Sequence, residues 1–216
     1  MKLKVCGLKY EDNVKELSSL AIDYMGFIFY KKSPRYIDAQ LSFDFIRTLP
    51  SHIKKVGVFV NESCYSVLNT VAHYNLDYVQ LHGDESENVC AELKPFVKVI
   101  KAFRVNDDFD FKNLEKYVPH VDAFLFDTDT KNYGGSGLQF NWDILKNYQI
   151  NTPFFLSGGI DETSIEKLKV VNHPQLHTID INSKFEIEPG LKNSEKIKQF
   201  IVKIKDNDNT KKQLPR

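Results

Sequence analysis

Two residues of this sequence have side chains suited to proton transfer and stand where a short apolar run ends. Cys6 follows Lys4 by two positions in KVCGL, and Asp127 closes the run AFLFD. A thiol whose pKa is lowered by a lysine or a dipole can act as a base or a nucleophile. Partial desolvation raises the pKa of a carboxyl group and suits it to act as an acid. The alternatives are a buried structural cysteine and an aspartate that caps the next loop.

A second group of residues is suited to binding an anion. Arg35, in SPRY, can bind a carboxylate or phosphate through two parallel hydrogen bonds, unless it is a solvated surface arginine. Glycine pairs and loop N–H groups can hold a phosphate, and a plain strand-to-helix turn is the alternative. The candidate phosphate residues are Gly158, Gly159, Asp180, Asn182 and Ser183.

Two further segments are predicted to touch a ligand. His82, in QLHGD, is the one histidine among six that stands at a predicted strand end. A metal site would need two or three such ligands, so we expect His82 to contact substrate and expect no metal. The segment YGGSG holds Gly134, Gly135 and Gly137, which make it too flexible for a tight turn. We predict a lid or a ligand-contacting loop there.

Eight short runs rich in β-branched and aromatic residues position these side chains, and their starts are 20 to 31 residues apart. This spacing accommodates a strand, a crossover helix and two loops. The predicted strands are Leu3–Leu8, Tyr24–Tyr30, Lys55–Val60, Asp77–His82, Val97–Val105, Asp122–Thr128, Pro153–Ile160 and His177–Ser183. Helical spacing of apolar residues between them predicts helices over Glu11–Leu20, Tyr65–Tyr74, Glu87–Leu93, Phe111–Val118, Ser164–Val171 and Ser194–Ile204.

The alternation of strands and helices predicts an α/β fold with a parallel sheet. Several strands are apolar on both faces, as strands buried between two layers are. An open doubly wound sheet is possible, but even spacing without a composition break favours a single-domain (β/α)₈ TIM barrel over residues 1–205. The polar segment 206–216 is predicted to be a disordered tail. In such a barrel the candidate residues meet at the carboxyl ends of the strands.

Composition excludes several classes of protein. The 216 residues include 29 Lys plus Arg and 29 Asp plus Glu, so a protein built to grip nucleic acid or an anionic membrane is not indicated. The three cysteines are widely spaced, which fits a reducing cytoplasm better than a disulfide framework. We expect no signal peptide and no membrane span. The oligomeric state, monomer or homodimer, stays open.

With these residues assembled, the chain resembles the phosphoribosylanthranilate isomerases of tryptophan biosynthesis. The matching segments run in order over most of the chain. They are KVCGL at 4–8, GFIFYKKSPRYI at 26–37, VGVFVN at 56–61, VQLHGDE at 79–85, FLFDT at 124–128, YGGSGLQFNW at 133–142, FFLSGGI at 154–160 and DINSKFEIEPGLKN at 180–193.

The resemblance implies a (β/α)₈ barrel that catalyses an Amadori rearrangement of N-(5-phosphoribosyl)anthranilate without cofactor or metal. It implies Asp127 as the acid that opens the sugar ring and Cys6 as the base that removes the C2 proton. It assigns Arg35 to the anthranilate group, and the phosphate to Gly158, Gly159 and the 180–183 segment. The glycine-rich loop would close over the substrate.

The chain departs from the family pattern at Lys9 and Tyr10, and at Lys184 beside the predicted phosphate site. Neither departure removes a proposed catalytic group. Two other functional interpretations remain open. One is another phosphosugar barrel enzyme, such as an indole-glycerol-phosphate synthase or a pentose-phosphate epimerase. The other is a barrel that binds a phosphometabolite without catalysis.

Overall fold

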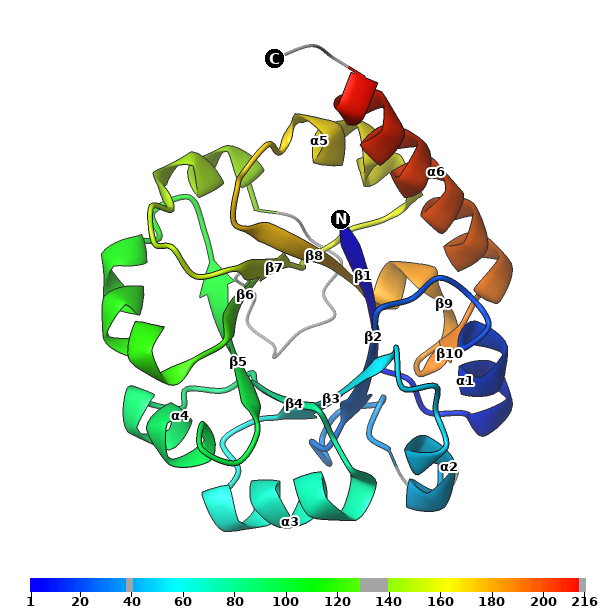
Figure 1. Ribbon diagram of the computed structural model, residues 1–216, viewed down its shortest axis with the longest axis vertical. Coiled ribbons are helices and arrows are strands. Elements are labelled where there is room, and N and C mark those ends of the chain that lie inside the picture. Colours follow the sequence, from blue (N-terminus) through cyan, green and yellow to red (C-terminus); the bar gives the residue numbers. More distant parts are fainter. Residues whose placement is uncertain (38–40, 129–139, 214–216) are drawn as a thin grey trace.

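A closed parallel barrel forms the centre of the molecule (Figure 1). The structure is a computed structural model that describes residues 1–37, 41–128 and 140–213, with side chains to residue 205. Within these residues eight strands pair in chain order, and the last pairs with the first. They are β1 (Lys2–Cys6), β2 (Tyr24–Ile28), β3 (Lys54–Phe59), β4 (Tyr78–Leu81), β5 (Lys98–Val105), β6 (Ala123–Thr128), β7 (Phe154–Leu156) and β8 (Leu176–Ile181). The predicted barrel is confirmed.

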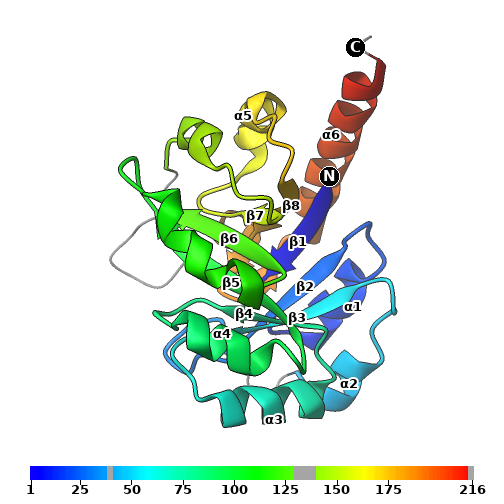
Figure 2. The same ribbon diagram turned by 60° about the vertical axis from the view of Figure 1, so that its left-hand side comes forward.

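Helices surround the barrel on its outside (Figures 1 and 2). They are α1 (Glu11–Leu17), α2 (Phe43–Arg47), α3 (Cys64–Tyr74), α4 (Glu87–Leu93), η1 (Phe111–His120), η2 (Trp142–Asn147), η3 (Glu162–Ser164), α5 (Ile165–Val170), η4 (Ser183–Phe185) and α6 (Ser194–Gln213), where η marks a 3₁₀ helix. Among the described residues, no helix is both long and apolar enough to cross a membrane.

The helical layer differs from the sequence prediction in three places. The short helices α2 and η2 carry no clear helical stripe, and no range was predicted for them. The predicted helix 111–118 is a 3₁₀ helix, with Pro119 in its last turn. The backbone of α6 remains helical to Gln213, beyond residue 205, where the sequence predicts a disordered tail.

A small antiparallel hairpin follows β8 and lies outside the barrel beside α1 (Figure 1). Its strands are β9 (Glu186–Glu188) and β10 (Leu191–Lys192). The sequence prediction has no element here. Asn13 on α1 holds the hairpin: its side-chain amide accepts from the Lys192 N–H at 2.8 Å and donates to the Lys192 carbonyl at 2.9 Å.

The barrel interior is apolar at one level and polar at the next. One buried apolar cluster consists of Tyr24, Val56, Ile100, Ala102, Ala123, Leu125 and Phe155. Lys4, Gln80 and Asp180 are buried polar residues, and the register places Lys4 directly beside Asp180. A larger apolar core fills the space between the strands and the outer helices. Because β1 ends at Cys6 and β6 ends at Thr128, both predicted catalytic residues stand at carboxyl ends of strands, at one mouth of the barrel.

Candidate active site

The Cys6 thiol lies in a space that a neighbouring glycine leaves open. Cys6 is buried at the end of β1, and its register partner on β2 is Gly26. A Cβ atom at Gly26 would lie 2.7 Å from Cys6 Sγ, closer than nonbonded atoms approach. Gly26 is therefore required for the position of the thiol, a role that no pattern in the sequence indicated.

A buried ion pair lies beneath the thiol. Lys4 precedes Cys6 by two residues on the same strand face, and its Nζ donates to Asp180 Oδ2 at 2.7 Å and to Gln80 Oε1 at 2.8 Å. Lys4 is fully buried and Asp180 is nearly so. Asp180 was predicted at the phosphate end of the site. The structure instead points its carboxylate at Lys4 inside the barrel, where a negative charge supports the lysine and not an anion.

The environment of Cys6 differs from the one predicted for it. The sequence interpretation expects a lysine to lower the pKa of the thiol. In the structure, burial raises the pKa of Cys6, and the nearby charges of Lys4 and Lys192 oppose this rise without cancelling it. The prediction of a lowered pKa is wrong because desolvation disfavours the thiolate more than these cations stabilise it.

Asp127 and His82 face each other at the mouth. Asp127 is largely buried, and its Oδ1 accepts from the Thr128 N–H at 2.9 Å. Its Oδ2 lies 3.3 Å from His82 Nε2, without the alignment of a hydrogen bond. The predicted acid and the predicted ligand-binding histidine are therefore brought together.

The tautomer of His82 follows from its other neighbours. Because Lys4 donates to Gln80 Oε1, the amide group of Gln80 faces His82, and its Nε2 donates to His82 Nδ1 at 2.7 Å. The imidazole proton then resides on Nε2. Within the described residues this buried Nε2 has no hydrogen-bond partner, so its N–H can serve a ligand at the mouth.

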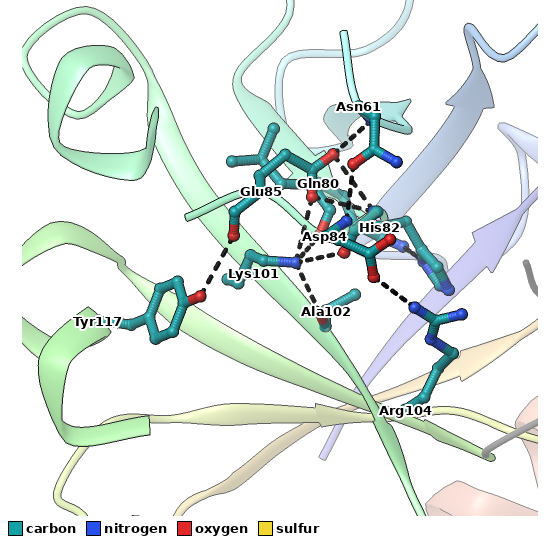
Figure 3. A network of polar contacts seen from close by, with 11 residues as sticks. Asn61, Gln80, His82, Asp84, Glu85, Lys101, Ala102, Arg104 and Tyr117 are labelled. Atoms are coloured by element: carbon teal, nitrogen blue, oxygen red, sulfur yellow. Dashed lines mark hydrogen bonds and ion pairs between the residues drawn. The ribbon is translucent and has the colours of Figure 1, made fainter. Parts of the chain in front are cut away.

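A polar network beneath the 82–85 turn holds His82 in place (Figure 3). The buried Lys101 Nζ donates to the carbonyls of Leu81 and Gly83 at 3.2 and 2.8 Å, and it lies 3.2 Å from Glu85 Oε2. Glu85 accepts from the Gly83 N–H at 2.9 Å and from the Asn61 N–H at 2.8 Å. The sequence interpretation missed Lys101 and Glu85, because only the pairing of β4 with β5 brings Lys101 to the 81–85 segment.

Arg35 is held by the hairpin that follows β8. Its Nε and Nη2 donate to the two carboxylate oxygens of Glu186 at 2.9 and 2.7 Å. The same carboxylate accepts from Lys192 Nζ at 2.6 Å. Neither Glu186 nor Lys192 was predicted as a functional residue. The pair stands in the segment EIEPGLK, whose turn residues at Pro189 and Gly190 were the available signal.

The remaining predicted binding residues lie at the ends of β7 and β8, which are neighbours in the barrel. Gly158 and Gly159 follow β7 with φ values of +93° and +63°, and a Cβ at Gly158 would lie 2.7 Å from the Thr128 nitrogen. Asn182 and Ser183 follow β8, and Asn182 Oδ1 accepts from Lys192 Nζ at 2.6 Å. Gly134, Gly135 and Gly137 lie outside the described residues.

The departures at Lys9 and Tyr10 have a structural explanation. Tyr10 Oη donates to Glu188 of β9 at 3.1 Å, and a Cβ at Gly190 would lie 2.8 Å from Lys9 Cβ. Both residues therefore pack against the hairpin. Within the part of the chain that the structure describes, no three His, Cys, Asp or Glu side chains are grouped to hold a metal ion.

Comparison with known proteins gives one consistent family. The model of the N-(5'-phosphoribosyl)anthranilate (PRA) isomerase family matches residues 3–203. An N-(5'-phosphoribosyl)anthranilate isomerase of Parabacteroides distasonis is 45% identical over 209 residues, covering 94% of this chain and 93% of its own length.

Two solved structures share the fold over nearly their whole length. One is a phosphoribosyl anthranilate isomerase in complex with reduced 1-(o-carboxyphenylamino)-1-deoxyribulose 5-phosphate. It has a TM-score of 0.80 and 29% identity, and the match covers 95% of this chain and 99% of that chain. The other shows monomers generated from the dimeric enzyme of Thermotoga maritima. It has a TM-score of 0.78 and 29% identity, with 95% and 98% coverage.

Proposed function

The chain belongs to the N-(5'-phosphoribosyl)anthranilate isomerase family, and we propose that it converts N-(5-phosphoribosyl)anthranilate to 1-(2-carboxyphenylamino)-1-deoxyribulose 5-phosphate in tryptophan biosynthesis. The observation that carries the assignment of the chemistry is the pair Cys6 and Asp127. They stand at the carboxyl ends of β1 and β6, at the same mouth of one barrel, as an acid and a base that act on one substrate must.

Asp127 acts first, as the general acid. Its proton goes to the furanose ring oxygen, the C1–O bond breaks, and the nitrogen lone pair forms a C1=N iminium ion. Asp127 suits this step because its Oδ1 is fixed by the Thr128 N–H, while its Oδ2 lies 3.3 Å from His82 Nε2 and makes no hydrogen bond with it. The Nε2–H of His82 supplies a donor that can bind a substrate hydroxyl or the carboxylate left on Asp127.

Cys6 acts second, as the general base. After its thiol proton has passed to solvent, the thiolate takes the proton from C2. The electron pair of the C2–H bond then forms the C1=C2 bond of an enolamine while the iminium nitrogen is neutralised. The enolamine then loses its C2 hydroxyl proton and gains a proton at C1, which gives the ketone. Substrate and product are isomers, so the net reaction consumes no oxidant and no reductant.

Binding follows from the two ends of the substrate. Arg35 takes the anthranilate carboxylate, since a guanidinium binds carboxylate with matching geometry. The N–H groups of Gly158 and Gly159, with Asn182 and Ser183, take the phosphate. Support comes from the positive φ values that turn the glycine backbone at the end of β7. The loop of Gly134, Gly135 and Gly137 is proposed to close over the substrate.

We propose further that the enzyme is cytoplasmic and works as a monomer or a homodimer. All three cysteines lie within the described residues and carry free thiols, which supports a reducing compartment. Sedimentation of the purified chain distinguishes the two oligomeric states.

The proposed function is tested by turnover of the purified protein. Loss of the substrate's anthranilate fluorescence should follow addition of wild-type enzyme. Cys6→Ser and Asp127→Asn should each lose about 10²- to 10⁴-fold in kcat, the range for one acid–base group, with an unchanged far-ultraviolet spectrum.

Matched controls are Cys64→Ser on α3 and Asp44→Asn, exposed on α2, which should keep full activity. An inactive wild-type protein would refute the proposed function. A Cys6→Ser or Asp127→Asn enzyme as active as its control would refute only the role of that residue.

A further inference from the structure

The hairpin after β8 brings one carboxylate between two cations. Glu186 Oε2 lies 2.7 Å from Arg35 Nη2, and Glu186 Oε1 lies 2.6 Å from Lys192 Nζ. The side chains of Arg35, Glu186 and Lys192 are 13%, 5% and 0% exposed, so water screens these charges weakly. The group carries a net charge of +1 when Lys192 is protonated.

Lys192 is held in place beside Glu186 by further contacts. Its backbone is clamped on both sides by Asn13, and its ammonium also donates to Asn182 Oδ1 at 2.6 Å. Burial lowers the pKa of Lys192 to about 8, while the charge of Glu186 opposes this decrease. The ammonium is therefore still mostly protonated at pH 7.

The balance matters because Arg35 is the proposed ligand of the substrate carboxylate. An arginine paired bidentately with a glutamate has no net charge to offer an approaching anion. With Lys192 present, the negative charge of Glu186 is shared between two cations. Arg35 then keeps a net positive charge that can attract an anion at the mouth of the barrel. Glu186 then orients the guanidinium without neutralising the site.

We infer that Lys192 determines specificity for a substrate that carries a carboxylate, acting through Glu186 to keep Arg35 positive. The inference rests on the proposed function, in which Arg35 binds the anthranilate carboxylate. It adds a residue 157 positions away from Arg35 that touches no substrate atom. It also gives a reason for the hairpin, since β9 and β10 each supply one member of the charge group.

The test compares two substrates, phosphoribosylanthranilate and the phosphoribosylaniline analogue that lacks the carboxylate. Product formation is followed by chromatography, and the ratio of the two kcat/KM values measures the preference for the carboxylate. Lys192→Met should reduce this ratio about thirtyfold, the effect of losing one charge at an assumed separation of roughly 8 Å and an effective dielectric constant of about 20. The loss of preference should appear mainly in KM for phosphoribosylanthranilate, because the carboxylate is bound equally in ground and transition states. A change in kcat that arises through the Cys6 thiol affects both substrates alike and cancels in the ratio.

The double variant Glu186→Gln/Lys192→Met separates charge from structure. It removes both ionic partners yet returns the group to a net charge of +1, so its ratio should recover to within about threefold of the wild type. A merely structural role of Lys192 predicts a double variant at least as impaired as Lys192→Met. Glu186→Gln alone gives the charge group a net charge of +2 and should keep the full preference for the carboxylate substrate. This variant tests the inference even where Lys192→Met does not fold.

Arg35→Met distinguishes the possible failures. An unchanged ratio in Arg35→Met would refute the proposed carboxylate role of Arg35 itself. A ratio that collapses in Arg35→Met but not in Lys192→Met would leave the proposed function intact and overturn this inference. A double variant no better than Lys192→Met, or a reduced ratio in Glu186→Gln, would overturn it as well.

Discussion

Substitution of Gly26 by alanine should displace the proposed base, Cys6, and reduce its activity while leaving the thiol itself in place. Gly26 has no positive φ, so its backbone accepts alanine. The added Cβ would lie 2.7 Å from Cys6 Sγ, 3.1 Å from Cys6 Cα and 3.2 Å from Cys6 Cβ. Nonbonded carbon atoms in contact are about 3.5 to 4.0 Å apart, so the sulfur must move by about 1 Å.

That displacement gives the expected magnitudes. A misplacement of about 1 Å in a reacting group costs about 10²-fold in rate, so kcat should fall by that factor. Forcing one methyl group into a packed interior costs about 1 to 3 kcal/mol of unfolding free energy. The KM should change little, because the three atoms nearest the added methyl group all belong to Cys6, and none belongs to Arg35 or to the glycines after β7.

Gly57→Ala is the matched control. Gly57 lies on the next strand, β3, and its added Cβ would lie 2.5 Å from Leu76 Cδ1 and 2.8 Å from Phe59 Cε2 instead of a catalytic group. Steady-state kinetics and urea unfolding of both variants give the comparison. Both should lose stability, and Gly26→Ala alone should lose turnover. Equal activities would refute the reasoning, as would a Gly26→Ala stability loss that does not shrink when Cys6 is replaced by alanine.

Two further predictions concern buried charges. The pKa of Cys6 is raised above the ordinary value of about 8.5. In a Cys64→Ser/Cys90→Ser background, the rate at which iodoacetamide alkylates Cys6 should therefore still increase with pH above pH 9. A rate that levels off near pH 8 would contradict the raised pKa. Lys4→Met should cost about 3 to 5 kcal/mol of unfolding free energy, because it leaves the Asp180 carboxylate buried and unpaired. The double variant Lys4→Met/Asp180→Asn should recover much of this loss, and urea unfolding of both variants measures it. A double variant no more stable than Lys4→Met would contradict the role of the ion pair.

The parts of the site that could be predicted are those that depend on position along one strand. Cys6 and Asp127 were identified because each ends an apolar strand, and barrel strands bring their ends together. The same reasoning gave the barrel itself, since a segment such as Ala123–Thr128 is buried on both faces. Such features are local, and a single chain segment displays them.

The contacts across the barrel could not be predicted in this way. Lys4 and Asp180 are 176 residues apart, and only the closure of β1 against β8 makes them neighbours. Lys192 and Glu186 depend on a hairpin of five strand residues in all, too short to give a periodic signal. A sequence pattern indicates which residues face inward, while register decides which of them meet.

The pairing of these lysines also explains why the expected effect on Cys6 failed. Lys4 and Lys192 both act on the thiol, yet each is already balanced by a carboxylate, Asp180 or Glu186. Burial of the thiol outweighs the stabilisation of the thiolate by the two lysines, and the charge of Asp180 adds to the rise, so the pKa of Cys6 stays raised. In the proposed mechanism the missing positive charge then comes from the substrate, because ring opening by Asp127 creates an iminium ion at C1, next to the carbon that Cys6 deprotonates. The iminium ion makes the C2 proton acidic and stabilises the thiolate that forms when Cys6 releases its proton to solvent, so Cys6 can act as the base only after the acid step. The charge arrangement thus imposes the order of the two proton transfers.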